Sequence, residues 1–125
     1  TTAKLQEAGA AVSLFIDPVE DEVRASADTG ARYIELHTGA FSRAVGRREL
    51  AREVRRLVSS SVLAHELGLG VNAGHGINYF NVRLLFDVPH LHELNIGHSI
   101  VSRALIVGTR RAVREMLDLM RGYRP

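Results

Sequence analysis

A short pattern that occurs twice carries much of the chemistry that this sequence could perform. Residues 72–77 read Asn-Ala-Gly-His-Gly-Ile, and residues 95–100 read Asn-Ile-Gly-His-Ser-Ile. Glycine lets the backbone approach a ligand closely, and free amides at the start of a helix bind anions. We therefore predict a phosphate site at Gly76, Gly97 and His98. The alternative is a pair of tight turns that need glycine only for their shape.

Two ionisable side chains are candidates for acid/base chemistry. His75 lies inside the first copy of the pattern, and imidazole titrates near neutral pH, so it suits a general acid or base. A turn histidine bonded to a loop carbonyl explains the same pattern equally well. Glu35 lies within an apolar segment, where a carboxylate is costly to bury unless it is paired or used. We interpret Glu35 as functional, with a structural ion pair as the alternative.

Metal and thiolate chemistry find less support. Three histidines, His37, His75 and His98, could ligate zinc or iron together with Glu35, but their spacings match no recognised ligand motif. The other histidines are expected to be surface or packing residues: His65, His90 and His92. The sequence has no cysteine, which excludes disulfides and thiolate catalysis. It also has no nucleophile elbow, dinucleotide fingerprint or Walker-type lysine loop.

The elements that must position these residues are short apolar strands alternating with amphipathic helices, which is typical of a parallel α/β sheet. We predict strands at residues 11–16, 32–37, 70–73 and 93–96. We predict helices at about residues 3–8, 18–29, 47–67, 78–86, 99–107 and 109–121. Asp17 reads as the N-cap of the second of these helices, followed by Pro18 at the first helical position. The stretch between residues 37 and 47 is expected to be a loop.

Alternation within the strands makes one face of the sheet polar, because residues two apart face the same side. That face carries Ser13, Asp17, Glu35, His37, Asn72 and Asn95. A doubly wound sheet would be apolar on both faces, whereas the lumen of a barrel opens into an active site. We therefore predict part of a (β/α)8 barrel. Such barrels often bind phosphate at the loops after strands 7 and 8 and at a short extra helix, and residues 99–107 fit that helix.

Composition narrows the class of protein. The 125 residues are 46% hydrophobic and 24% charged, which suits one globular domain. Lys and Arg number 16 against 14 Asp and Glu, and the arginines are dispersed, so nucleic acid is not an expected partner. No apolar run reaches the roughly 20 residues that span a bilayer, and no signal peptide opens the chain. We expect a cytoplasmic protein with no membrane contact.

Four segments in order and at similar spacing resemble the last four strands of the pyridoxine 5′-phosphate synthase family. They are residues 12–17, 33–39, 71–76 and 92–100, with the sequences Val-Ser-Leu-Phe-Ile-Asp, Tyr-Ile-Glu-Leu-His-Thr-Gly, Val-Asn-Ala-Gly-His-Gly and His-Glu-Leu-Asn-Ile-Gly-His-Ser-Ile. The resemblance covers nearly the whole chain. It implies that residues 1–125 form the C-terminal half of a single barrel domain, strands 5 to 8, because a full barrel takes about 250 residues.

The resemblance also implies a reaction. The family condenses 1-deoxy-D-xylulose 5-phosphate with 3-amino-2-oxopropyl phosphate to pyridoxine 5′-phosphate in vitamin B6 biosynthesis. Phosphate and water are released, and no metal or organic cofactor takes part. By position, Glu35 resembles the residue that stabilises charge in the transition state, and His75 resembles the proton donor. Gly76, Gly97 and His98 resemble the residues that hold the aminoketone phosphate. A homo-oligomer is expected.

The chain departs from the family in one large respect. The first four strands of the family carry an acid/base histidine, an acid/base glutamate and residues that bind the sugar phosphate, and nothing here corresponds to them. We expect this chain alone to be inactive. Two alternatives stay open: another phosphate-binding barrel enzyme, such as an aldolase or isomerase, and a non-catalytic half-barrel that self-associates through its open edges. A Schiff-base aldolase needs a lysine at a strand end, and the only lysine is Lys4, in the leading helix.

Overall fold

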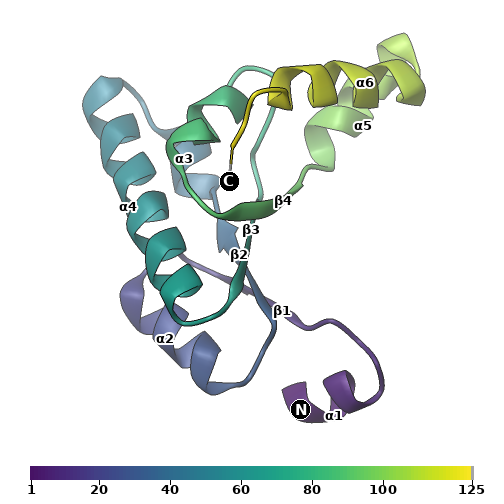
Figure 1. Ribbon diagram of the computed structural model, residues 1–125. Helices are drawn as coiled ribbons and strands as arrows, with labels where there is room; N and C mark the ends of the chain where they lie inside the picture. The colour runs from purple at the N-terminus through teal and green to yellow at the C-terminus, as the bar shows by residue number, and fades with distance from the viewer. Residues whose placement is uncertain (125) are drawn as a thin grey trace.

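Four parallel strands form the sheet in the computed structural model, which describes residues 1–124 (Figure 1). The strands are β1 (Ser13–Ile16), β2 (Tyr33–His37), β3 (Gly70–Gly74) and β4 (Leu91–Asn95), and their order in the sheet follows the sequence. Each neighbouring pair is parallel. The predicted parallel α/β architecture is therefore confirmed, and the carboxyl ends of all four strands meet at one edge.

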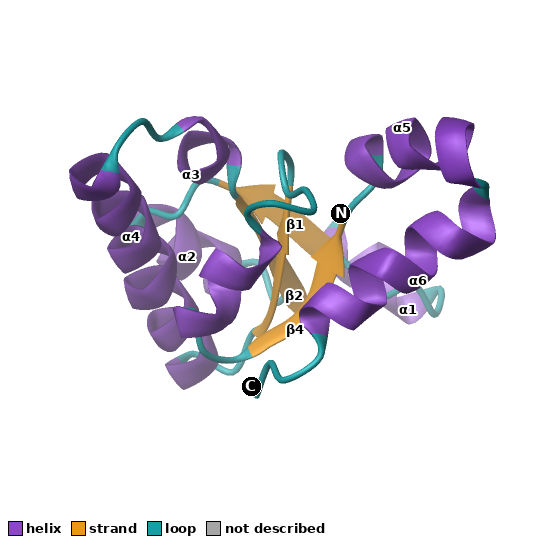
Figure 2. Ribbon diagram, turned by 90° about the horizontal axis from the view of Figure 1, so that it is seen from above, coloured by secondary structure: helices purple, strands orange, loops and turns teal. Residues whose placement is uncertain are grey.

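Helices precede, connect and follow the strands. They are α1 (Thr2–Glu7), α2 (Glu20–Asp28), α3 (Gly39–Arg43), α4 (Arg47–Glu66), the 3-10 helix η1 (Val82–Asp87), α5 (His98–Val107) and α6 (Thr109–Met120). Seen from above, α2, α3 and α4 gather on one side, while the hairpin of α5 and α6 extends away on the other (Figure 2). None of the helices within the described part of the chain combines the length and apolar character needed to cross a bilayer.

The core lies between one face of the sheet and the helices α2, α4, η1 and α6. Ile34 and Leu36 of β2 and Val71 of β3 are almost completely buried, and they belong to one cluster with Leu57 and other residues of α4. Burial of one such side chain stabilises the fold by roughly 1.5–3 kcal/mol. The predicted alternation of β2 and β3 is confirmed, because the residues between these apolar ones face the opposite side of the sheet.

The opposite face carries both polar and apolar side chains, among them Phe15, Glu35 and Asn72, which are paired across neighbouring strands. Phe15 is 58% exposed, and the Oδ1 atom of Asn72 is buried without a hydrogen-bond partner among the described residues. The register of β4 shifts once, because Val71 pairs with Leu91 and Asn72 pairs with Glu93. His92 is therefore an extra residue in β4. The alternation predicted for residues 93–96 lies beyond it and holds, because Leu94 and Ile96 pack against the core.

Several predicted boundaries are wrong for local reasons. The first strand begins at Ser13, since the residues before it lie outside the sheet ladder, and α2 begins at Glu20 after an extended Val19. Asp17 is not a helix cap. Its backbone amide donates to the Glu22 carboxylate at 2.8 Å, and its own carboxylate bonds to another strand.

Two short helices also differ from the prediction. Residues 78–81 form a turn instead of helix, because the Asn78 carboxamide accepts hydrogen bonds from the backbone amides of Phe80 and Asn81, a pattern that competes with helix formation. Only the 3-10 helix η1 follows, ending at Asp87 before Pro89. The stretch predicted as a loop contains α3. The long helix α4 and the pair α5 and α6, broken at Gly108, are confirmed within one residue.

Candidate functional site

The carboxyl ends of β2, β3 and β4 border a cavity of about 510 Å³. All five residues predicted to carry chemistry line it: Glu35, His75, Gly76, Gly97 and His98. Asn95 lines it as well, while His37 and Asn72 are not among the lining residues of the described chain. Residues up to 63 positions apart in the sequence thus reach one space, as the strand-end argument predicted.

Glu35 reaches this cavity by crossing β3 above a glycine. A Cβ atom at Gly74 would lie 2.0 Å from Glu35 Oε1, so only glycine leaves room for the crossing. On the far side, Asn95 Nδ2 donates a hydrogen bond of 2.6 Å to Glu35 Oε2. Within residues 1–124 no arginine or lysine forms an ion pair with Glu35, so its partner is an amide and the ion-pair interpretation has no support. The carboxylate is held by a neutral donor at the rim of the cavity.

His75 lies in a strained turn that directly follows β3. Its φ angle is +74°, and that of Gly76 is +82°. A histidine in this left-handed region is uncommon, and such strain persists where neighbouring groups enforce it. Thr38 is that neighbour: its amide donates to the Gly74 carbonyl oxygen at 2.8 Å. Its hydroxyl lies 2.8 Å from the same oxygen and 2.7 Å from the carbonyl oxygen of His75.

Gly76 is equally enclosed. A Cβ atom there would lie 2.3 Å from the hydroxyl oxygen of Ser42, a residue of α3. The Asn81 side chain donates to the Gly76 carbonyl oxygen at 3.1 Å. Helix α3, which was not predicted, therefore packs against the turn that carries His75.

His37 lies next to His75. Their ring centroids are 4.8 Å apart, and the ring planes meet at 61°. His37 Nδ1 lies 3.0 Å from Asp17 Oδ1. The sequence placed Asp17 and His37 on the polar face, but the contact between them was not predicted. Strand parity could have found it, because Ile16 pairs with Leu36 and each residue follows one of these paired positions.

The opposite wall of the cavity is the start of α5. Gly97 caps this ten-residue helix, whose first intrahelical bond runs from the Val101 amide to the Gly97 carbonyl. The amides of the first turn therefore have no intrahelical partner and favour an anion. Ser99 Oγ donates to the Ile77 carbonyl oxygen at 2.9 Å, which ties the start of α5 to the turn after β3. The geometry suits a phosphate between the two copies of the pattern.

The described residues contain no candidate metal site. Among residues 1–124, no group of three or more histidine, aspartate and glutamate side chains is arranged to hold one. His65 and His90 stack face to face with ring centroids 3.8 Å apart, and His92 stacks on Tyr33 at 5.8 Å. His65 and His92 are exposed and His90 is half-buried, so these three are surface or packing residues, as predicted.

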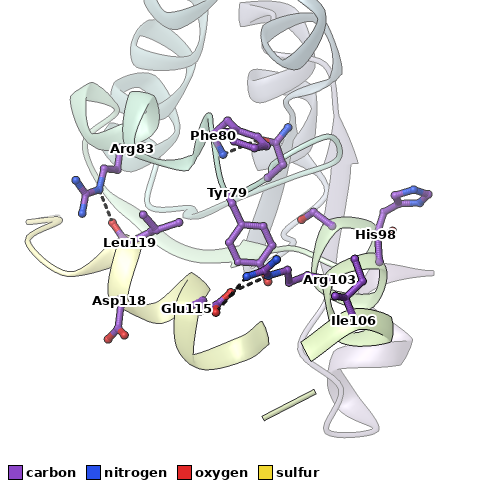
Figure 3. Close-up of a pocket in the computed structure, with 12 residues that line it drawn as sticks. Tyr79, Phe80, Arg83, His98, Arg103, Ile106, Glu115, Asp118 and Leu119 are labelled. Carbon is purple, nitrogen blue, oxygen red and sulfur yellow. Dashed lines mark hydrogen bonds and ion pairs between the residues drawn. The ribbon is translucent and has the colours of Figure 1, made fainter. Parts of the chain in front are cut away.

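A second cavity of about 810 Å³ lies behind the start of α5, between the residues before η1 and the α5–α6 hairpin (Figure 3). The Tyr79 hydroxyl donates to the Ala112 carbonyl oxygen at 2.9 Å. Arg103 Nε lies 2.8 Å from Glu115 Oε2 (Figure 3). Hydrogen bonds from Arg103 and Arg111 lower the pKa of Glu115 to about 2. Burial and the nearby Glu115 carboxylate raise the pKa of Tyr79. No sequence motif indicated this contact between successive helices.

Comparison with known proteins finds similar sequences over nearly the whole chain. The family model described as "Pyridoxal phosphate biosynthesis protein PdxJ" matches residues 1–122. Three similar proteins are each named pyridoxine 5′-phosphate synthase. That of Akkermansia muciniphila is 58% identical over 117 residues, 93% of this chain and 47% of its own length. Those of Synechocystis sp. and Geotalea daltonii are 52% and 50% identical, over 95% and 94% of this chain and 49% of their own lengths. The chain spans about half the length of the curated relatives it matches.

Proposed function

The chain belongs to the PdxJ family of pyridoxal phosphate biosynthesis proteins, and on that premise we propose that the complete protein is a pyridoxine 5′-phosphate synthase. It would condense 1-deoxy-D-xylulose 5-phosphate with 3-amino-2-oxopropyl phosphate in vitamin B6 biosynthesis. The observation that carries the proposal is the convergence of Glu35, His75, Gly76, Gly97 and His98 on one cavity. The sequence alone predicts the same five residues.

In this proposal residues 1–125 supply strands 5 to 8 of a single (β/α)8 barrel domain. The strands are parallel and sequential, and β1 and β4 each have a neighbour on one side only. The relatives are about twice as long as this chain, which is the length of a full barrel. Exposed apolar residues on the α5–α6 hairpin, such as Leu105, Ile106 and Leu117, would be covered by the other half.

The proposed roles divide the cavity into two parts. His75 is the proton donor, and Glu35 stabilises charge that develops in the transition state. Its hydrogen bond from Asn95 supports that role, because a fixed carboxylate needs no reorganisation as charge develops. Gly76, Gly97 and His98 hold the phosphate of the aminoketone substrate at the start of α5. The protein is a cytoplasmic homo-oligomer in this proposal, and neither a metal nor an organic cofactor takes part.

The aldolase alternative has no support in the cavity. Lys4, the only lysine, is an exposed residue of α1, and it is not among the residues that line the space between the strand ends. A Schiff base with a substrate held there has no amine partner in this sequence.

Two measurements test the proposal in the natural protein that carries this sequence. Purified protein supplied with both substrates should form pyridoxine 5′-phosphate, while residues 1–125 alone should form none, because at least two acid/base groups of the family lie outside them. Absence of product with the natural protein would overturn the assignment.

The second measurement addresses the anion site. Titration with inorganic phosphate should shift the backbone amide signals of Gly76, Gly97 and His98 at millimolar concentration. Gly46 and Gly108 are matched controls, because both lie outside the cavity and also have positive φ angles. Equal shifts at controls and site, or no shift at the site, would contradict the phosphate assignment.

A further inference from the structure

The His75 imidazole has one close ring neighbour and no side-chain hydrogen bond within the described residues. Thr38 fixes the backbone of the turn through the Gly74 and His75 carbonyls, yet these bonds leave the torsions of the His75 side chain free. The His75 ring itself is contacted by the His37 imidazole in a T-shaped arrangement, with the two ring centroids 4.8 Å apart. The orientation of His75 therefore depends on a second histidine.

His37 is itself prevented from turning. Asp17 Oδ1 lies 3.0 Å from its Nδ1 atom, and Phe15 meets the ring edge-on with centroids 5.1 Å apart. The ring also lies over Gly39, where a Cβ atom would come within 2.7 Å of Nε2. Contacts from β1, from the loop after β1 and from the start of α3 thus hold one imidazole in one orientation.

We propose that His37 is a positioning residue for His75, and that Asp17 fixes His37 in turn. This inference rests on the proposed synthase function, in which His75 gives up a proton. A general acid must be held within about 0.5 Å and 10–20° of the productive geometry by groups that are themselves locked. The Asp17–His37 pair is such a group, because it touches His75 without lining the cavity.

The arrangement also explains where the two glycines of this region lie. Gly39 leaves space for the His37 ring, and Gly76 leaves space for Ser42. The segment that ends β2 and follows it therefore contacts the turn after β3 in two places. The His37 ring contacts the His75 ring, and Ser42 lies against the backbone of Gly76. Asp17 contributes through an exposed carboxylate, since its side chain is 60% exposed while that of His37 is 27% exposed.

The test is a set of variants in the natural protein. His37→Gln removes the ring that meets His75, and we expect turnover to fall about 10- to 100-fold, because misplacement of a catalytic group by about 1 Å can reduce the rate 10²-fold. The KM for 3-amino-2-oxopropyl phosphate should change less than about threefold, because the phosphate is held by amides elsewhere. Asp17→Asn, which keeps a side chain of the same shape, should lower turnover by a smaller factor.

A double variant separates positioning from a general structural role. In a His75→Asn background there is no proton donor to position, so adding His37→Gln should change turnover by less than about twofold. Two residues that act independently would instead show effects that multiply. His65→Gln is the control, since the His65 ring also contacts a histidine ring, that of His90, but lies outside the cavity. Its turnover should equal that of the unmodified protein.

Three results would overturn the inference. His37→Gln and Asp17→Asn at full turnover would show that the pair does not act on His75. Multiplying losses in the double variant would show that His37 acts independently of it, and a rise in KM equal to the loss of turnover would make His37 a binding residue. Each of these leaves the synthase assignment intact, provided that the unmodified protein is active. An inactive unmodified protein would remove the proposed function and this inference together.

Discussion

The two copies of the Asn-x-Gly-His pattern have different structures although their sequences are nearly the same. In the first copy His75 and Gly76 take left-handed conformations, with φ angles of +74° and +82°. In the second copy Gly97 has a φ of −101°, and His98 begins the helix α5. One pattern therefore gives a strained turn beside β3 and a helix start beside β4.

Their surroundings explain the difference. β3 is a central strand, and the turn after it is enclosed by Thr38 and Ser42 from the element that follows β2. β4 is at the edge of the described sheet, and a Cβ atom at Gly97 would meet no atom within 4 Å. No residue of α5 is buried. The proposed acid/base side of the cavity is thus fixed by contacts among the described residues, whereas the proposed phosphate side has few such contacts.

The largest expected effect tests the first copy. His75→Asn in the natural protein keeps a hydrogen-bonding side chain of similar size but cannot transfer a proton at neutral pH. Because a proton donor acts in the transition state, turnover should fall by roughly 10² to 10⁴ while binding of 3-amino-2-oxopropyl phosphate changes little. Steady-state kinetics and a direct binding titration check the two parts.

His98→Asn is the matched variant at the equivalent position of the second copy. It should weaken binding of the aminoketone phosphate more than it lowers turnover at saturating substrate, because His98 is assigned to ground-state binding. If the two histidine variants lose turnover and binding in the same ratio, the assigned difference between the copies is wrong.

Much of this comparison was accessible from the sequence. The strand alternation around Glu35 and the repeat itself predicted which residues would share one edge of the sheet. The backbone difference between the two copies could not be predicted from the sequence, because it depends on Thr38 and Ser42. These two residues are distant in sequence and belong to no motif. Asp17 was misread as a cap, since Asp-Pro before an acidic stretch fits a helix start as well as a strand-end carboxylate. Local patterns specify elements, while the contacts between loops depend on the register of neighbouring strands.

A second pair of variants tests the backbone of each copy. Gly76→Ala places a Cβ in a left-handed residue and against Ser42, so the free energy of unfolding should fall by about 1–3 kcal/mol. Gly97→Ala introduces a side chain at a negative φ with open space around it, so the change should stay within about 1 kcal/mol and can be stabilising. Urea unfolding of the natural protein measures both.

A double variant locates the origin of the Gly76 effect. Ser42→Ala removes the hydroxyl that the new Cβ would meet, so Gly76→Ala in that background should lose less stability than in the unmodified chain. Equal losses in both backgrounds would assign the whole effect to the φ angle. Similar losses for Gly76→Ala and Gly97→Ala would contradict the contrast between an enclosed and an open copy.

The smallest expected effect concerns the ion pair between α5 and α6. This pair supports the helix hairpin that begins at the second copy of the pattern, residues 95–100, which is the open copy. Hydrogen bonds from Arg103 and Arg111 lower the pKa of Glu115 from 4.5 to about 2. A carboxyl whose pKa is lower in the folded state contributes stability above its unfolded pKa and loses it as the pH falls through the folded pKa. The hairpin should therefore have its full support above about pH 4.5 and lose it between there and pH 2.

Hydrogen exchange of backbone amides measures this support locally, with Glu115→Gln as the reference because glutamine cannot ionise. At pH 6 the α6 amide of Met116 should be better protected in the unmodified protein than in the variant, and near pH 2 the two should be nearly equal. The β3 amide of Val71 is the internal control, and its protection should be the same in both proteins at each pH. Comparing the two proteins at the same pH removes the pH dependence of exchange itself. If the Met116 difference persists undiminished near pH 2, the Arg103–Glu115 pair is not what holds α6 to α5, and the open copy must be supported by apolar packing instead.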